Sequence, residues 1–149
     1  MPEPTRRALG GPGVVLVVVY GLLALAATGR SVLQILSDYG GAPLAYTLSA
    51  VAAAVYILAT WCLARGGKWV RVGTWACTIE LVGVLVVGAA SYLFPDAFPD
   101  KTVWSHFGQG YGFVPLVLPV LGLLWFRKVE RDAAAAERAQ ADTRTSAAG

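Results

Sequence analysis

Two ionisable side chains, Arg30 and Glu80, lie inside the long apolar blocks of this sequence. A charge within a membrane span is costly, so such residues usually face other helices and mark an ion or proton pathway or a structural contact. The chemistry that they suggest is proton exchange at Glu80, or a polar contact that fixes helix packing. The two residues are predicted ~12 Å apart along the membrane normal. We therefore expect Arg30 to bond backbone carbonyls, with a direct ion pair as the alternative.

Glu80 is predicted ~12 Å from the inner edge of the third apolar block, close to the middle of a ~30 Å hydrocarbon core. Tyr56 is predicted at the same depth on the preceding block, so we expect a hydrogen bond between Tyr56 and Glu80. Small residues, among them Gly73, Cys77 and Gly83, share the face of Glu80. Such faces let helices approach closely, which predicts that Glu80 points into a helix bundle.

Further polar side chains are predicted at the level of Arg30. Pro115 has no N–H for the carbonyl of Tyr111, and Pro119 has none for that of Pro115, so these prolines predict free carbonyl groups and a helix hinge. The predicted intramembrane polar network consists of Arg30, Gln34, Ser49, Tyr56, Glu80, Gln109 and Tyr111.

Other catalytic or metal-binding patterns are weak. Cys62 and Cys77 form no CxxC pair and are expected to be small packing residues. His106 is the single histidine, which excludes a bis-histidine haem; a weak metal or proton-sensing cluster with Asp96 and Asp100 is the alternative to a solvated histidine. The sequence shows no catalytic triad, phosphate-binding loop or paired carboxylates. We expect no enzyme activity, no cofactor and no metal.

The elements that must position these residues are membrane-spanning helices. Hydrophobic residues make up 56% of the 149-residue chain and charged residues 14%, against about 25% charged residues in soluble domains. We predict an all-α polytopic membrane protein, an antiparallel four-helix transmembrane bundle with short loops. A tail over 1–12 would precede a membrane domain over 13–127, with spans at about 14–36, 44–64, 72–93 and 107–126. A signal peptide is the alternative for the first span.

The basic residues sort by membrane side. Except for Arg30 and Lys101, they lie before the first span, between the second and third, or after the fourth, at Arg6, Arg7, Arg65, Lys68, Arg71, Arg127, Lys128, Arg131, Arg138 and Arg144. The positive-inside rule then predicts that both termini are cytoplasmic. We expect a multi-pass protein of the bacterial cytoplasmic membrane, without a nucleic-acid partner, because these residues do not share one soluble face.

The connections and the C-terminal tail give three further expectations. The five tryptophans fall near predicted membrane boundaries and predict an aromatic belt, formed by Trp61, Trp69, Trp75, Trp104 and Trp125. The outer segment 94–107 is the longest predicted loop and the expected docking place for a partner. The tail over 128–149 is predicted to be helical in VERDAAAAERAQAD and disordered in TRTSAAG.

The segments YGLLALAATGRSVLQIL, APLAYTLSA and FPDKTVWSHFGQGYGFVPLVLP resemble an uncharacterised family of small bacterial four-span membrane proteins, over about residues 12–128. The resemblance implies the same topology and no known activity. Our leading hypothesis is a non-catalytic bundle that scaffolds or regulates a membrane-protein partner, or forms a homo-oligomer, in the lipid bilayer. The alternative is a small proton-coupled transporter that uses Glu80 as its intramembrane carboxylate. A quinone or thiol oxidoreductase is disfavoured by the cysteine spacing and the single histidine.

Overall fold

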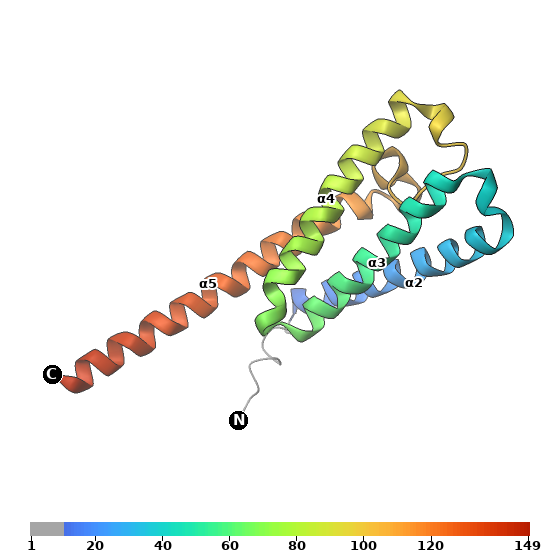
Figure 1. The fold of residues 1–149 in the computed structure, drawn as a ribbon. Helices are drawn as coiled ribbons and strands as arrows, with labels where there is room; N and C mark the ends of the chain where they lie inside the picture. Colours follow the sequence, from blue (N-terminus) through green and yellow to red (C-terminus); the bar gives the residue numbers. More distant parts are fainter. Residues whose placement is uncertain (1–10) are drawn as a thin grey trace.

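The computed structural model describes residues 11–149, and every regular element in that range is helical. Four long helices, connected by short 3-10 segments, make up most of the chain (Figure 1): α2 (Pro12–Asp38), α3 (Pro43–Arg65), α4 (Val70–Leu93) and α5 (Val114–Ala148). The prediction of an all-α chain is confirmed. The predicted tail residues Arg6 and Arg7 lie outside the described residues.

Three of these helices, α2, α3 and α4, are long and apolar enough to cross a membrane. Pro12 and Pro43 stand in the first turns of α2 and α3, where a missing N–H removes no intrahelical bond. Gly66, with a φ of 60°, ends α3 and begins the tight turn into α4. This positive φ favours glycine because a Cβ would be strained there.

The helices pack closely where a small residue of one helix faces a side chain of another element. α2 packs mainly against α3, and α5 mainly against α4, whereas α2 and α5 meet at few points. Alanines such as Ala52 and Ala59 line the buried face of α3, which allows close approach. On α4, the ring of Phe126 occupies the space that a Cβ at Gly73 would need.

The fourth predicted span differs from the first three. Residues Ser105–Tyr111 form a 3-10 segment, η4, whose axis is bent by 96° against that of α5. Together, η4 and α5 could cross a membrane only as one span with a sharp bend in it. The predicted fourth span over about 107–126 therefore contains a bend, and its α-helical part begins at Val114. His106, Phe107 and Gly108 have positive φ angles, and Pro115 restricts the conformation of the residue before it. Pro115 stands in the first turn of α5, next to the bend, and Pro119 lies inside the helix; a hinge at these prolines stays a prediction.

The connection between α4 and α5 folds back into the helix bundle. Thr102, Val103, Trp104 and Ser105 are all buried, and we call these four residues the plug. The ring of Trp104 packs on Gly83, so its side chain reaches about ten residues down α4 from the helix end at Leu93. Trp104 is 3% exposed and is therefore no belt residue, contrary to the prediction.

The burial of the plug also corrects the expectation that the whole 94–107 loop is a docking surface. Residues 102–105, in its second half, are part of the core, whereas Pro95 to Ala97 form a short exposed 3-10 turn, η3. A segment whose backbone lacks the regular hydrogen bonds of an α-helix can lie within a membrane only where other parts of the protein surround it. The burial of the plug meets this condition.

The C-terminal part of α5 runs to Ala148 as one helix (Figure 1), so the predicted disorder of the last seven residues is wrong. The alanine-rich sequence favours helix, and the hydroxyl groups of Thr143 and Thr145 donate to the carbonyls of Ala139 and Ala141. All residues from Glu130 onward are exposed. This segment projects beyond the ends of the other helices as a single exposed rod.

Candidate functional site

Glu80 lies at the centre of a fully buried polar group. The side chain is 0% exposed, and its Oε2 accepts a hydrogen bond of 2.7 Å from the hydroxyl of Tyr20. The Oη of Tyr20 also lies 3.4 Å from Sγ of Cys77. Because the single hydroxyl proton of Tyr20 goes to Glu80, the thiol is the donor in the second bond. We call Tyr20, Cys77 and Glu80 the Glu80 cluster.

Three helices bring the Glu80 cluster together. Tyr20 comes from α2, while Cys77 and Glu80 lie three residues apart on one face of α4, as neighbours on a helix do. Gly122 of α5 closes the cluster. A Cβ at Gly122 would come within 2.8 Å of Cys77 Sγ and 3.4 Å of Tyr20 Oη, so only a glycine fits there without displacing the two polar groups.

The partner of Glu80 is not the predicted one. The Oη of Tyr56 accepts a hydrogen bond of 2.9 Å from Nε1 of Trp104 in the plug, and the hydroxyl that reaches Glu80 belongs to Tyr20. The predicted depth of Tyr56 is compatible with the structure, because the rings of Tyr20 and Tyr56 have centroids 6.3 Å apart. Sequence reasoning missed Tyr20, although a lone tyrosine in the aliphatic run of the first span was an available signal.

Several buried polar atoms have no hydrogen-bond partner within the described residues. They are Ser31 Oγ, Gln34 Oε1, Ser49 Oγ and Glu80 Oε1. Two of them, Gln34 and Ser49, belong to the predicted network but make no contact that joins it to Glu80. The free Oε1 of Glu80 leaves the carboxyl group able to make one more hydrogen bond, to a proton of its own, a water molecule or a ligand.

Arg30 belongs to a separate polar group near the other end of α2. Its Nη2 donates to the backbone carbonyl of Lys101 at 2.5 Å. A backbone carbonyl was the expected partner, but it belongs to Lys101 and not to Tyr111, which is half-buried against the core. Arg30 lies ten residues beyond Tyr20, or ~15 Å along the helix, which keeps it apart from Glu80. Gln109 lines a polar cavity together with Arg30.

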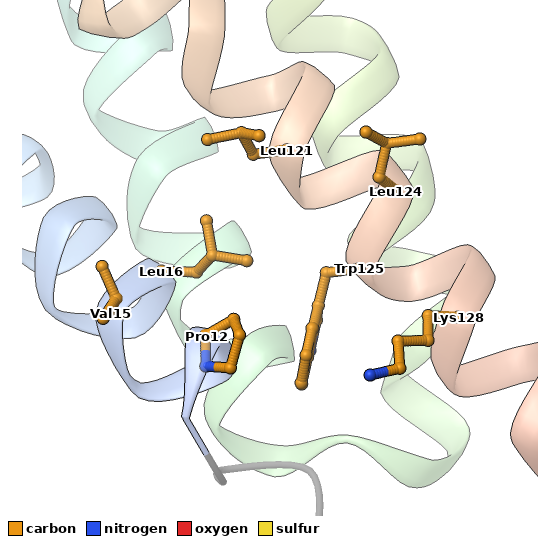
Figure 2. Close-up of a pocket in the computed structure, with 7 residues that line it drawn as sticks. All are labelled: Pro12, Val15, Leu16, Leu121, Leu124, Trp125 and Lys128. Atoms are coloured by element: carbon orange, nitrogen blue, oxygen red, sulfur yellow. The ribbon is translucent and has the colours of Figure 1, made fainter.

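An apolar cavity lies between α2 and α5 (Figure 2). It has a volume of about 560 Å³ and is lined by Pro12, Val15 and Leu16 on one side and by Leu121, Leu124, Trp125 and Lys128 on the other. Lys128 is its single charged residue, and the ammonium group lies 5.6 Å from the ring of Trp125. None of the residues of the Glu80 cluster lines this cavity.

Within residues 11–149, no three His, Cys, Asp or Glu side chains lie close enough together to hold a metal ion. Cys62 and Cys77 are both free and buried. Ser49, Tyr56 and the Glu80 cluster offer hydroxyl, thiol and carboxyl groups. Only the three members of the Glu80 cluster are hydrogen-bonded to one another.

The fold and the site define the chain as an all-helical protein in which three helices, or four if the bent pair is counted as one span, are apolar and long enough to cross a membrane. No known protein family, no curated protein and no solved structure matches the chain.

Proposed function

We propose that the chain is a four-span protein of the bacterial cytoplasmic membrane, an antiparallel bundle with both termini in the cytoplasm. Its fourth span would be the bent pair of η4 and α5. The basic residues support this orientation: Lys68 and Arg71 at the α3–α4 turn line a cavity of about 400 Å³ together with Val129 and Glu130 of α5. The basic turn and the basic part of α5 therefore lie at the same end of the bundle, as the positive-inside rule requires.

This orientation predicts the side on which the C-terminus lies. A reporter enzyme active only in the cytoplasm, fused after Gly149, should be active, and the same reporter inserted at Asp96 in the exposed η3 turn should be inactive. Thiol labelling of single-cysteine variants at the same two positions provides an independent measurement. An outward C-terminus in both assays would overturn the orientation.

We further propose that the protein is a non-catalytic scaffold or regulatory bundle, acting with a membrane-protein partner or as a homo-oligomer. The observation that carries this proposal is the position of the Glu80 cluster, which is buried at the junction of α2, α4 and α5. A carboxyl group that is hydrogen-bonded between helices fixes their register.

The exposed C-terminal part of α5 is the element best placed for a partner. Its residues from Glu130 to Ala148 are helical and exposed. The segment combines charged residues with alanines and carries no large apolar side chain, so it has no broad apolar face to hold it against the other helices. In the proposed orientation, this helix stands in the cytoplasm.

A second candidate function is a small proton-coupled transporter, and the free Oε1 of Glu80 is the observation that favours it. A buried carboxyl group with one unpartnered oxygen can take up and release a proton. In this candidate, Glu80 would be the coupling carboxylate, and Tyr20 and Cys77 would be its hydrogen-bond partners.

Substitution of Glu80 separates the two candidates. For a scaffold, Glu80→Gln should leave stability within about 1 kcal/mol, because a Gln Oε1 still accepts the Tyr20 hydroxyl, whereas Glu80→Leu should cost about 1–3 kcal/mol by leaving that hydroxyl without an acceptor. Unfolding in mixed micelles measures both. Tyr20→Phe is the matched substitution, because it removes the hydroxyl group that donates this same hydrogen bond to Glu80.

The transporter predicts a different result from the same variants. Proteoliposomes with an internal pH dye and an imposed pH gradient should then show a proton flux for the wild type, and a folded Glu80→Gln variant should lose it. Such a loss would contradict the scaffold. Absence of any flux from the wild type, together with destabilisation by Glu80→Leu, would contradict the transporter.

A further inference from the structure

A second polar site lies at the end of the bundle opposite the projecting α5 helix. It is a cavity of about 300 Å³ above the plug, lined by Arg30, Lys101, Thr102, Ser105, His106, Gln109 and Gly110. Its residues come from α2, from the connection after α4 and from η4. The Glu80 cluster does not contribute to it, so the site is independent of the proposed scaffold function.

The lining is rich in positive charge and contains no carboxylate. Arg30 and Lys101 are cationic, and the imidazole of His106 can donate a hydrogen bond. The nearest acidic residue along the chain, Asp100, has both oxygens engaged: Oδ2 accepts from the hydroxyl of Tyr46 at 3.0 Å, and Oδ1 accepts from the backbone N–H of Lys101 at 2.8 Å. These bonds hold the Asp100 carboxylate on Tyr46 and on the backbone of Lys101, and it is not among the residues that line the cavity.

The wall is held in place by contacts on several sides. The bond from Arg30 to the Lys101 carbonyl fixes α2 against the loop. Below it, the buried hydroxyl groups of Thr102 and Ser105 lie 3.0 Å apart, and Ser105 Oγ also accepts the N–H of Thr102 at 2.8 Å. The cavity thus has a floor of ordered hydroxyl groups.

His106 is held in a conformation that a residue with a side chain rarely adopts. Its φ is 52°, which costs energy for a residue other than glycine. The N–H of His106 donates to Ser91 Oγ at 2.9 Å, and its ring meets the ring of Tyr92 edge-on with centroids 4.6 Å apart. These contacts offset the strain and keep the backbone that carries the imidazole beside the cavity.

We infer that this cavity binds the phosphate group of a small phosphoester. A guanidinium, an ammonium, hydroxyl groups, an imidazole and the amide of Gln109 approach it from different sides, which suits the several oxygens of a phosphate better than the two of a carboxylate. A volume near 300 Å³ lies at the lower end of the range for small-molecule sites. It exceeds the space that a bare phosphate fills, so part of the ester group fits as well.

The phosphate can come from a soluble phosphoester or from the headgroup of a phospholipid. The test is a calorimetric titration of the full-length protein, purified in a phosphate-free maltoside detergent, with glycerol 1-phosphate. The wild type should bind saturably, and Lys101→Gln should weaken binding about tenfold, as expected for the loss of one charge-assisted hydrogen bond. Lys101 is suited to this test because its backbone carbonyl, and not its exposed side chain, bonds Arg30.

Lys68→Gln is the matched control, since it removes the same charge from an exposed lysine at the opposite end of the bundle and should leave binding unchanged. Arg30→Gln should also weaken binding, and circular dichroism shows whether that variant keeps its helices. Repetition in phospholipid nanodiscs identifies the source. Unchanged binding there indicates a soluble ligand, and loss of binding indicates that a lipid headgroup occupies the cavity. No saturable binding in detergent, or equal weakening by Lys101→Gln and Lys68→Gln, would overturn the inference.

Discussion

Replacement of Trp104 by alanine should destabilise the folded protein by about 3–5 kcal/mol, the usual cost of removing a large aromatic side chain from a core. Trp104 is 3% exposed, its indole N–H donates to Tyr56, and its ring fills the space over Gly83. The substitution would leave a cavity in the middle of the bundle. Equilibrium unfolding in mixed micelles, followed by circular dichroism, measures the change.

Trp75→Ala provides the matched control, because Trp75 is 65% exposed. Its side chain faces the solvent or detergent in both the folded and the unfolded state, so its removal leaves no cavity. We expect a change within about 0.5 kcal/mol, as for surface substitutions in general. Trp104→Phe should fall between the two, since it keeps most of the ring and loses the hydrogen bond. If both alanine variants were equally stable, the plug could not be part of the core.

Gly73→Ala should destabilise the protein by about 1–3 kcal/mol, because a single added methyl group overpacks a tight contact. A Cβ at Gly73 would overlap the ring of Phe126 and come 2.9 Å from the Cβ of Cys62. Phe126 and Cys62 are both buried, so neither can move away easily. The expected result is a lower unfolding midpoint in the same micelle assay.

Gly29→Ala tests whether the effect belongs to the contact and not to glycine in general. Gly29 lies in α2 with nothing within 4 Å of an added Cβ, and alanine has the higher helix propensity by about 1 kcal/mol. This variant should be as stable as the wild type or more stable. In a Phe126→Leu background, the cost of Gly73→Ala should fall, because the pair is coupled by direct contact. A cost that stayed the same in that background would contradict the packing described for α4 and α5.

The first three helices were predictable because each is one continuous apolar run with breaking residues at its ends, such as Pro43 and Gly66. Length and composition suffice for such segments. The burial of Glu80 was also predictable, from the small residues that share its face. Its partner was not, because depth along the membrane normal cannot distinguish between helices: Tyr20 and Tyr56 lie at similar levels, and packing around Trp104 decides which of them reaches Glu80.

The plug was not predictable from the patterns used. Its buried residues, such as Val103 and Trp104, follow neither a helical nor a strand period. Moreover, the aromatic-belt prediction took the depth of each tryptophan from its distance along the chain to the end of a predicted span. That estimate fails for Trp104, because the chain turns back between the helices before it. The glycines before α5 and Pro115 did predict a break in the helix. A break does not show, however, whether the chain then runs over the surface or turns into the core. The helical C-terminus was missed because the polar composition of TRTSAAG favours disorder, whereas the preceding alanine-rich helix continues through it.

The early return of the chain through the plug leaves α5 with a short apolar stretch. From Val114 to Phe126 it is ~20 Å long at ~1.5 Å per residue, less than the ~30 Å thickness of the hydrocarbon layer. In the proposed topology, such a helix would insert poorly by itself, and the buried residues 102–105 would leave water only once the earlier helices were present to pack against them. In the proposed orientation, the last crossing therefore depends on helices that are already in place, and a ribosome stalled after α4 would hold a three-helix intermediate without its central tryptophan.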